Sequence, residues 1–200
     1  RTIGEFDLLV EDTYTGKTMH WELAVKFYLN AGDSTQATNW VGPGQRDRLD
    51  IKIKHMHSHQ SRLRHEPAAD LVLRQLGIEV DETWLLLKGR LFYRFGGPAS
   101  APPQACPEHL RGFWISASRF SEAFVGRQLL ALKRSQWLAP LEGVNMSHTV
   151  DSKTLLDRIA DQLKAFPQCL AVIQNGVEIT RGFVVADDWQ KRPAHSSVHR

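Results

Sequence analysis

The sequence predicts an α/β protein, because patterns typical of strands and of helices follow one another along its 200 residues. Apolar and polar residues alternate through 18–29, which is the period of a strand with two different faces. Apolar residues recur at helical spacing near 49–63 and 155–166, each time after an aspartate that can cap a helix. Asn175 and Gly176, between two apolar runs, are the strongest short-range signal for a β-hairpin.

The N-terminal segments 2–10 and 18–29 are predicted to form a hairpin or an adjacent pair of strands. Side chains alternate between the two faces of a strand, so Glu5 and Asp7 share one face of the first segment. One face of the second segment carries His20, Glu22, Ala24, Lys26 and Tyr28, and the opposite face carries Trp21, Leu23, Val25 and Phe27. Because the latter face is wholly apolar, we expect it to be buried and the polar face to line solvent or a site.

Periodicity and stop signals predict the remaining elements. A helix is expected from about 47 to 64, where Asp47 can cap it and Pro67 prevents its continuation. Its apolar stripe includes Gln60, a polar side chain that needs hydrogen-bond partners in a buried seam. The other expected elements are a helix at 68–76 ending at Gly77, paired strands at 84–88 and 91–95 around Gly89, a strand at 112–116, a helix at 118–125, an amphipathic stretch at 128–138, a helix from 151 or 152, and a hairpin of 170–174 with 177–186.

The domain organisation is predicted from one change in composition. Residues 96–107 are rich in Gly, Pro, Ala and Ser, which is typical of a linker or long loop. We therefore expect a core at 1–95 and an α+β extension at 108–189 that packs on it, followed by a flexible polar tail at 190–200. The chain starts with Arg1 and its first strand signal starts at Thr2, so we expect that an N-terminal part has been lost.

The composition, with 42% hydrophobic and 24% charged residues, is that of an ordinary soluble globular protein. The apolar runs are far shorter than a membrane span, and no segment has the layout of a signal peptide, so a cytoplasmic location is expected. Cys106 and Cys169 form neither a disulfide framework nor a zinc-ligand pattern, and we expect them to be buried or incidental thiols.

The net charge is only +3, but basic residues gather between 46 and 64. This cluster fits a surface that faces a polyanion, and it fits a solvated basic helix face equally well. Arg48, Lys52 and His59 are the candidate contacts to nucleic acid, and Trp40, in a polar loop, is the candidate for stacking on a base. His55 and His59 are one helical turn apart, but no second ligand group accompanies them, so histidines near a phosphate-binding face are favoured over zinc. The other tryptophans considered are predicted to pack in the core: Trp21, Trp84, Trp114 and Trp137.

Acids on one strand beside an acid and a lysine on its neighbour are the groups that a metal-dependent phosphodiesterase needs. In this hypothesis Asp7 and Glu22 bind Mg²⁺ or Mn²⁺, and Lys26 orients or polarises the attacking water. Gln60 positions the water or the phosphate, whereas Glu5 is a weaker candidate. Two alternatives to these catalytic roles stay open. Asp7 is then an aspartate at the edge of the sheet, and Glu22 and Lys26 form a surface ion pair that would contribute little to stability.

Two sets of motifs carry a resemblance to known families. The strand motif GEFDLL, followed by a strand that reaches a lysine, resembles the PD-(D/E)XK nuclease superfamily, and Gln60 is similar in placement to the helical glutamine of its RecB-type members. More closely, TIGEFDLLVED, HWELAVKFYL, WVGPGQRDRLDIKIKHMHSHQ and LLLKGRLFY resemble the bacterial domain of unknown function 1853 family across nearly the whole chain. The resemblance implies a restriction-endonuclease-like core with a mixed central sheet flanked by helices, and an N-terminal helix with a further glutamate that this chain lacks.

The sequence departs from the superfamily pattern at one position. The superfamily has an acid two residues before the lysine, but this chain has Ala24 there, and its nearest acid on that face is Glu22. At about 3.3 Å per residue, Glu22 and Lys26 lie roughly 13 Å apart along a strand. We therefore consider two hypotheses: a metal-dependent nuclease-like domain that acts on DNA or RNA phosphodiesters, with DNA favoured, and a catalytically inactive module of the same fold that binds nucleic acid or a protein. A purely structural interaction module is a third.

Overall fold

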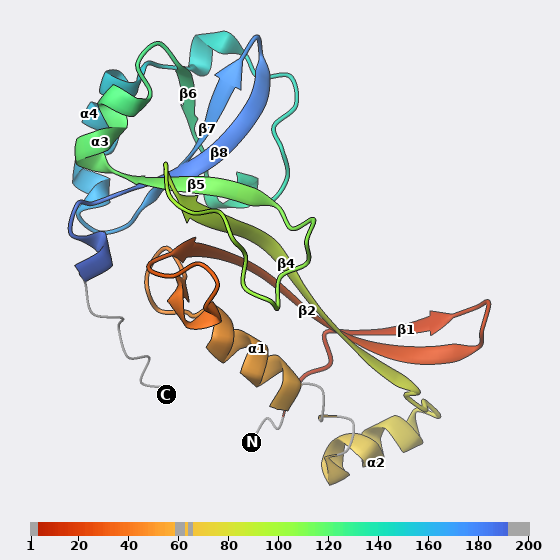
Figure 1. Ribbon diagram of the computed structural model, residues 1–200. Helices are drawn as coiled ribbons and strands as arrows, with labels where there is room; N and C mark the ends of the chain where they lie inside the picture. The colour runs from red at the N-terminus through yellow and green to blue at the C-terminus, as the bar shows by residue number, and fades with distance from the viewer. Residues whose placement is uncertain (1–3, 59–62, 64–65, 192–200) are drawn as a thin grey trace. The chain divides into compact units, whose positions relative to one another are not determined.

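The structure is a computed structural model that describes residues 4–58, 63 and 66–191 (Figure 1). It is an α/β fold with one mixed sheet, and four α-helices lie within the described residues. The strands are β1 (Leu8–Asp12), β2 (Lys17–Asn30), β3 (Trp40–Val41), β4 (Glu82–Arg94), β5 (Arg111–Ser116), β6 (Gln128–Ala131), β7 (Gln168–Gln174) and β8 (Val177–Val185). The helices are α1 (Leu49–Ser58), α2 (Pro67–Gln75), α3 (Ala117–Ala123) and α4 (Ser152–Leu163).

The strand order in the sheet is β1-β2-β4-β5-β8-β7-β6, and β3 pairs with β2 outside this path. β4, β5 and β8 are parallel to one another. The pairs β1–β2, β2–β3, β6–β7 and β7–β8 are antiparallel. The expected α/β class and mixed sheet are therefore confirmed.

The chain divides into two compact units. The first comprises Arg1–Lys26 and Asp50–Lys88, and the second comprises Phe27–Leu49 and Gly89–Arg200. The predicted linker, 96–107, lies inside the second unit, where it is part of the connection from β4 to the parallel strand β5. Its Gly- and Pro-rich composition thus belongs to a long loop between neighbouring strands, whereas the division falls within β2, after the first residue of α1 and within β4.

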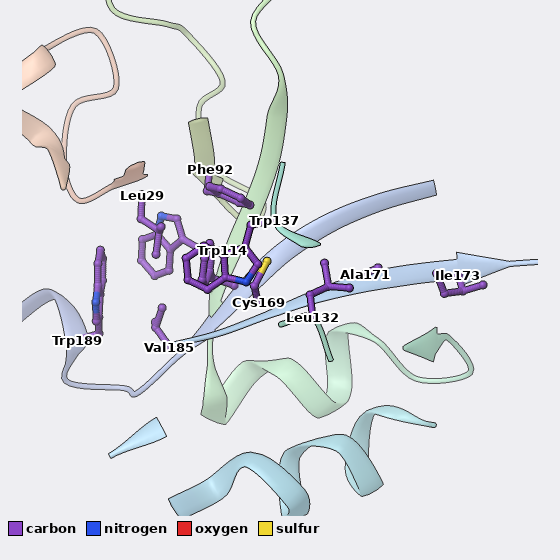
Figure 2. Close-up of a cluster of buried hydrophobic side chains, with 11 residues drawn as sticks. Leu29, Phe92, Trp114, Leu132, Trp137, Cys169, Ala171, Ile173, Val185 and Trp189 are labelled. Carbon is purple, nitrogen blue, oxygen red and sulfur yellow. The ribbon is translucent and has the colours of Figure 1, made fainter. Parts of the chain in front are cut away.

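The core of the second unit lies on both faces of the sheet. β5 illustrates this arrangement, because Trp114 belongs to one buried cluster whereas Phe113 and Ile115 belong to another. The first cluster also contains Phe92, Trp137 and Trp189 (Figure 2). The second cluster includes apolar side chains of α3 and α4, namely Phe120, Leu155, Ile159 and Leu163. A strand covered on both faces is apolar at successive positions, as β5 is.

Three local predictions are confirmed. Asn175 and Gly176 have positive φ angles of 52° and 76° at the turn between β7 and β8, the backbone that a two-residue hairpin turn requires. The side chain of Asp151 accepts a hydrogen bond from the N–H of Thr154 at 2.9 Å and caps α4. Helix α2 ends just before Gly77, which has a φ of 67°.

Other boundaries differ from those predicted. The strand expected at 2–10 begins only at Leu8, so Asp7 lies in a bend before it. Asp47 precedes α1, and its Oδ1 accepts a 3.3 Å hydrogen bond from the hydroxyl of Tyr28. The hairpin expected around Gly89 is one continuous strand, β4, in which Gly89 has a φ of 136°. Glycine tolerates this conformation, and pairing with neighbouring strands extends the run instead of folding it back.

The buried face of β2 is the opposite of the one predicted. Leu23 and Val25 are 44% and 51% exposed, whereas His20 and Glu22 are 0% and 1% exposed. Trp84, expected in the core, is 47% exposed and stacks on Trp21. The alternation of side chains shows that a strand has two different faces, but the elements that pack on it decide which face is covered.

Candidate functional site

Of the predicted acids, Asp7 lies just before β1 and Glu22 lies on β2, the strand that pairs with β1. Leu8, which pairs with Trp21, is the last residue of this ladder, and Asp7 lies in the bend just before it. Asp7 is exposed, and its Oδ2 accepts a hydrogen bond of 2.8 Å from the backbone N–H of Leu23. One carboxylate oxygen of Asp7 is therefore attached to β2 beside Glu22.

Glu22 is buried beside a histidine. The Nε2 of His20 lies 3.7 Å from the Oε2 of Glu22, and the edge of Phe6 packs against the imidazole at a centroid distance of 4.8 Å. His20 was placed on this face by the sequence pattern but was not assigned to the site. The two-residue spacing from Glu22 on a strand was the signal that could have identified it.

Lys26 lies further along the same face of β2. It is half-buried, as is the small Ala24 between it and Glu22. The strand rise of about 3.3 Å per residue keeps Lys26 roughly 13 Å from Glu22 along the backbone, so only extended side chains bring the two head groups closer. The face therefore carries a buried acid, a small side chain and a cation in succession along the strand.

The predicted contacts to nucleic acid fall in different parts of the chain. Lys52 is half-buried on α1 in the first unit, whereas Arg48 belongs to the second unit, where it forms an isolated bridge with Val41. Gln60 and His59 lie outside the described residues.

The prediction for Trp40 is wrong. Its side chain is fully buried, its indole N–H donates to the carbonyl of Ser34 at 2.9 Å, and its ring packs edge-on against Tyr93 at 4.9 Å. The polar loop before Gly42 suggested exposure, but the indole fills a space inside the second unit and cannot stack on a base.

The donor set of this face fits a hard divalent cation only in part. Within residues 4–58, 63 and 66–191, no group of three or more His, Cys, Asp or Glu side chains is arranged to hold a metal. Asp7 and Glu22 offer carboxylate oxygens, and Mg²⁺ is often held by one or two carboxylates together with water and substrate phosphate. The pair is thus compatible with Mg²⁺ or Mn²⁺ and incompatible with a closed structural zinc site.

An exposed ion pair fixes the start of β2 beside the start of β4. Lys17 Nζ lies 2.6 Å from Glu82 Oε1, and this contact raises the pKa of Lys17 and lowers the pKa of Glu82. The Oδ2 of Asp81 also accepts a 2.8 Å hydrogen bond from the backbone N–H of Thr18. These contacts attach the first residues of β2, the strand that carries Glu22 and Lys26, to the start of β4. They lie at the end of β2 that is far from Lys26.

Comparison with known proteins identifies the family. No curated protein and no solved structure matches the chain significantly. No helix in the described part of the chain has both the length and the apolar character needed to cross a membrane. A family model described as a domain of unknown function (DUF1853) matches residues 1–185, and the chain therefore belongs to the DUF1853 family, as the sequence motifs predicted.

Proposed function

We propose that this chain is a nuclease-like domain of the PD-(D/E)XK type, which hydrolyses nucleic-acid phosphodiesters with the help of a divalent cation. The observation that carries the proposal is the hydrogen bond that Asp7 accepts from the backbone N–H of Leu23, the residue next to Glu22 on β2, with Lys26 further along the strand face of Glu22.

Each side chain has a distinct task in this proposal. Asp7 and Glu22 would hold Mg²⁺ or Mn²⁺, and the hydrogen bond from the Leu23 N–H would keep the Asp7 carboxylate in position. A bound cation would polarise the phosphate and lower the pKa of a water molecule. Lys26 would contribute a compact positive charge beside that water and the phosphate oxygens.

The surface that would hold the nucleic-acid backbone is basic. Lys52 and Lys54 lie on α1 in the same unit as Asp7 and Glu22, and the sequence also assigns His59 to this role. Contacts of lysine with phosphate release counterions, so binding of DNA should weaken with added salt. DNA is the favoured substrate over RNA.

The test is a cleavage assay with Mg²⁺ or Mn²⁺ on plasmid DNA, single-stranded DNA and RNA. Asp7→Asn keeps an oxygen that can accept the Leu23 N–H bond but removes the negative charge, so folding should be preserved. We expect its rate to fall by more than the roughly 10–100-fold that loss of an outer-shell partner of a metal costs. Glu11→Gln, an exposed acid on β1, is the matched control and should leave the rate unchanged. Equal cleavage by wild type and Asp7→Asn would refute the assignment.

A catalytically inactive binding module is the second candidate. Ala24, at the position where the superfamily has an acid, favours it, and so does the lack of a three-ligand group among the described residues. This candidate predicts salt-dependent DNA binding, or binding of a protein, without cleavage and without uptake of Mg²⁺ or Mn²⁺ in calorimetry. Metal-dependent cleavage that Asp7→Asn abolishes would exclude it.

A further inference from the structure

A pocket of about 130 Å³ opens where three parallel strands of the second unit end. Its lining includes Arg94 at the end of β4, Ser116 at the end of β5 and Val185 at the end of β8. In open α/β sheets, ligands bind outside the carboxyl ends of parallel strands, because the loops that follow those strands bring together side chains distant in sequence. The pocket shares no residue with the Asp7–Glu22 face, so it is independent of the proposed nuclease function.

The charges in this pocket favour an anion. Two arginines, Arg94 and Arg119, and one acid, Asp187, line it, which leaves one net positive charge. The Arg94 guanidinium lies 5.8 Å from the centre of the Trp114 ring, a cation–π distance. Among the residues that the structure describes, neither arginine has a carboxylate within ion-pair distance. Asp187 is engaged, because its Oδ1 accepts the backbone N–H of Ser118 at 3.0 Å.

Hydroxyl groups complete the polar lining. The Oγ atoms of Ser116 and Ser118 lie 3.5 Å apart, and both residues line the pocket. A hydroxyl donates one hydrogen bond, and a guanidinium donates two in parallel to a phosphate or carboxylate. Among the described residues that line the pocket there is no histidine, and its one acid, Asp187, accepts the Ser118 N–H, so the arrangement suits binding rather than covalent catalysis.

We propose that this pocket binds a phosphate group, either as inorganic phosphate or as the end of a small phosphate ester. Its volume of about 130 Å³ equals that of about four water molecules at roughly 30 Å³ each, which admits a tetrahedral oxyanion. The planar forks of Arg94 and Arg119 match phosphate oxygens, and the net positive charge of the lining favours an anion.

The test is isothermal titration calorimetry of the whole chain with inorganic phosphate at constant ionic strength, repeated with acetate. The double variant Arg94→Gln/Arg119→Gln removes both guanidiniums from the pocket. Lys153→Gln/Arg158→Gln is the matched control, because it removes two positive charges from the exposed surface of α4 in the same unit. Circular dichroism and the unfolding midpoint of each variant report whether the fold is retained, and backbone NMR shifts of Ser116 and Ser118 report the location of binding.

We expect phosphate to bind wild type and the α4 control equally, and to bind the arginine double variant at least about tenfold more weakly. Phosphate should shift the amides of Ser116 and Ser118 in wild type. Three results would overturn the proposal: no phosphate binding to wild type, equal binding to the arginine variant, or acetate binding as tight as phosphate. If the double variant unfolds, the single variants Arg94→Gln and Arg119→Gln replace it, each with a smaller expected loss of affinity.

Discussion

Arg181 is the buried charge whose removal should destabilise the second unit most. The side chain is fully buried on β8, and all five of its N–H groups are used. Its Nε and Nη2 donate to the two carboxylate oxygens of Glu178 at 2.6 Å each. The remaining donors bind the carbonyls of Gln136, Trp137 and Ala139 at 2.7–2.8 Å.

The expected cost follows from what the substitution Arg181→Met leaves behind. Glu178 would keep a carboxylate that is only 6% exposed, and three carbonyls would lose their donors. Removing one partner of a buried ion pair costs about 3–5 kcal/mol, a large part of the roughly 5–15 kcal/mol that stabilises a typical domain. Arg181→Lys keeps the charge but offers three donors in place of five, so we expect a smaller loss, about 1–3 kcal/mol.

Urea unfolding followed by tryptophan fluorescence measures these losses, because the loop that Arg181 holds contains the buried Trp137. Arg158→Met on the exposed surface of α4 is the control and should leave the midpoint unchanged. A double variant that also replaces Glu178 by Leu should recover part of the loss, since no buried charge then remains unpaired. The reasoning would be refuted if Arg181→Met unfolded at the wild-type urea concentration, or if the double variant were less stable than Arg181→Met.

Three further predictions concern stability and reactivity. The Asp151 carboxylate caps α4, and its hydrogen bonds with the first turn hold its pKa below the ordinary value of 3.8. The carboxylate therefore stabilises the fold above the unfolded pKa, and this stabilisation is lost as pH falls through the lower folded pKa. Asp151→Ala should flatten the acid limb of a plot of Tm against pH. Burial raises the pKa of the Cys169 thiol to about 12, whereas Cys106 is exposed. A thiol reagent at neutral pH should therefore modify only Cys106 in the native protein and both cysteines in denaturant. Rapid modification of both cysteines in the native protein would contradict the buried position of Cys169. In Gly182→Ala the new methyl group would lie 2.4 Å from the ring of Phe113, and we expect a loss of about 1–3 kcal/mol in urea unfolding, whereas an unchanged midpoint would mean that the ring moves freely.

The candidate site was predictable only in part. The spacing of His20, Glu22 and Lys26 on a strand indicated that they share a face, and Asp7 was also assigned from the sequence; the structure adds the hydrogen bond between Asp7 and the Leu23 N–H. The phosphate-binding pocket was not found from the sequence, because Arg94, Arg119 and Asp187 are distant along the chain. Their positions relative to the predicted elements could have identified them. Arg94 and Asp187 lie at or just after the end of a predicted strand, and Arg119 lies at the start of the helix that follows another.

Local rules determined several features without the tertiary structure. The turn at Asn175 and Gly176 depends on the backbone angles that these two residues allow, and the start of α4 depends on the side chain of Asp151. Such features involve neighbouring residues only, so the same physical chemistry applies before and after folding.

The tertiary structure alone decided which surfaces are covered and how far strands extend. It buried Glu22 and left Leu23 half-exposed on the same strand, continued β4 through Gly89, and enclosed Trp40 within the second unit. Each of these outcomes depends on which distant segments pack or pair at that position, and the alternation of residues along one strand is compatible with burial of either face.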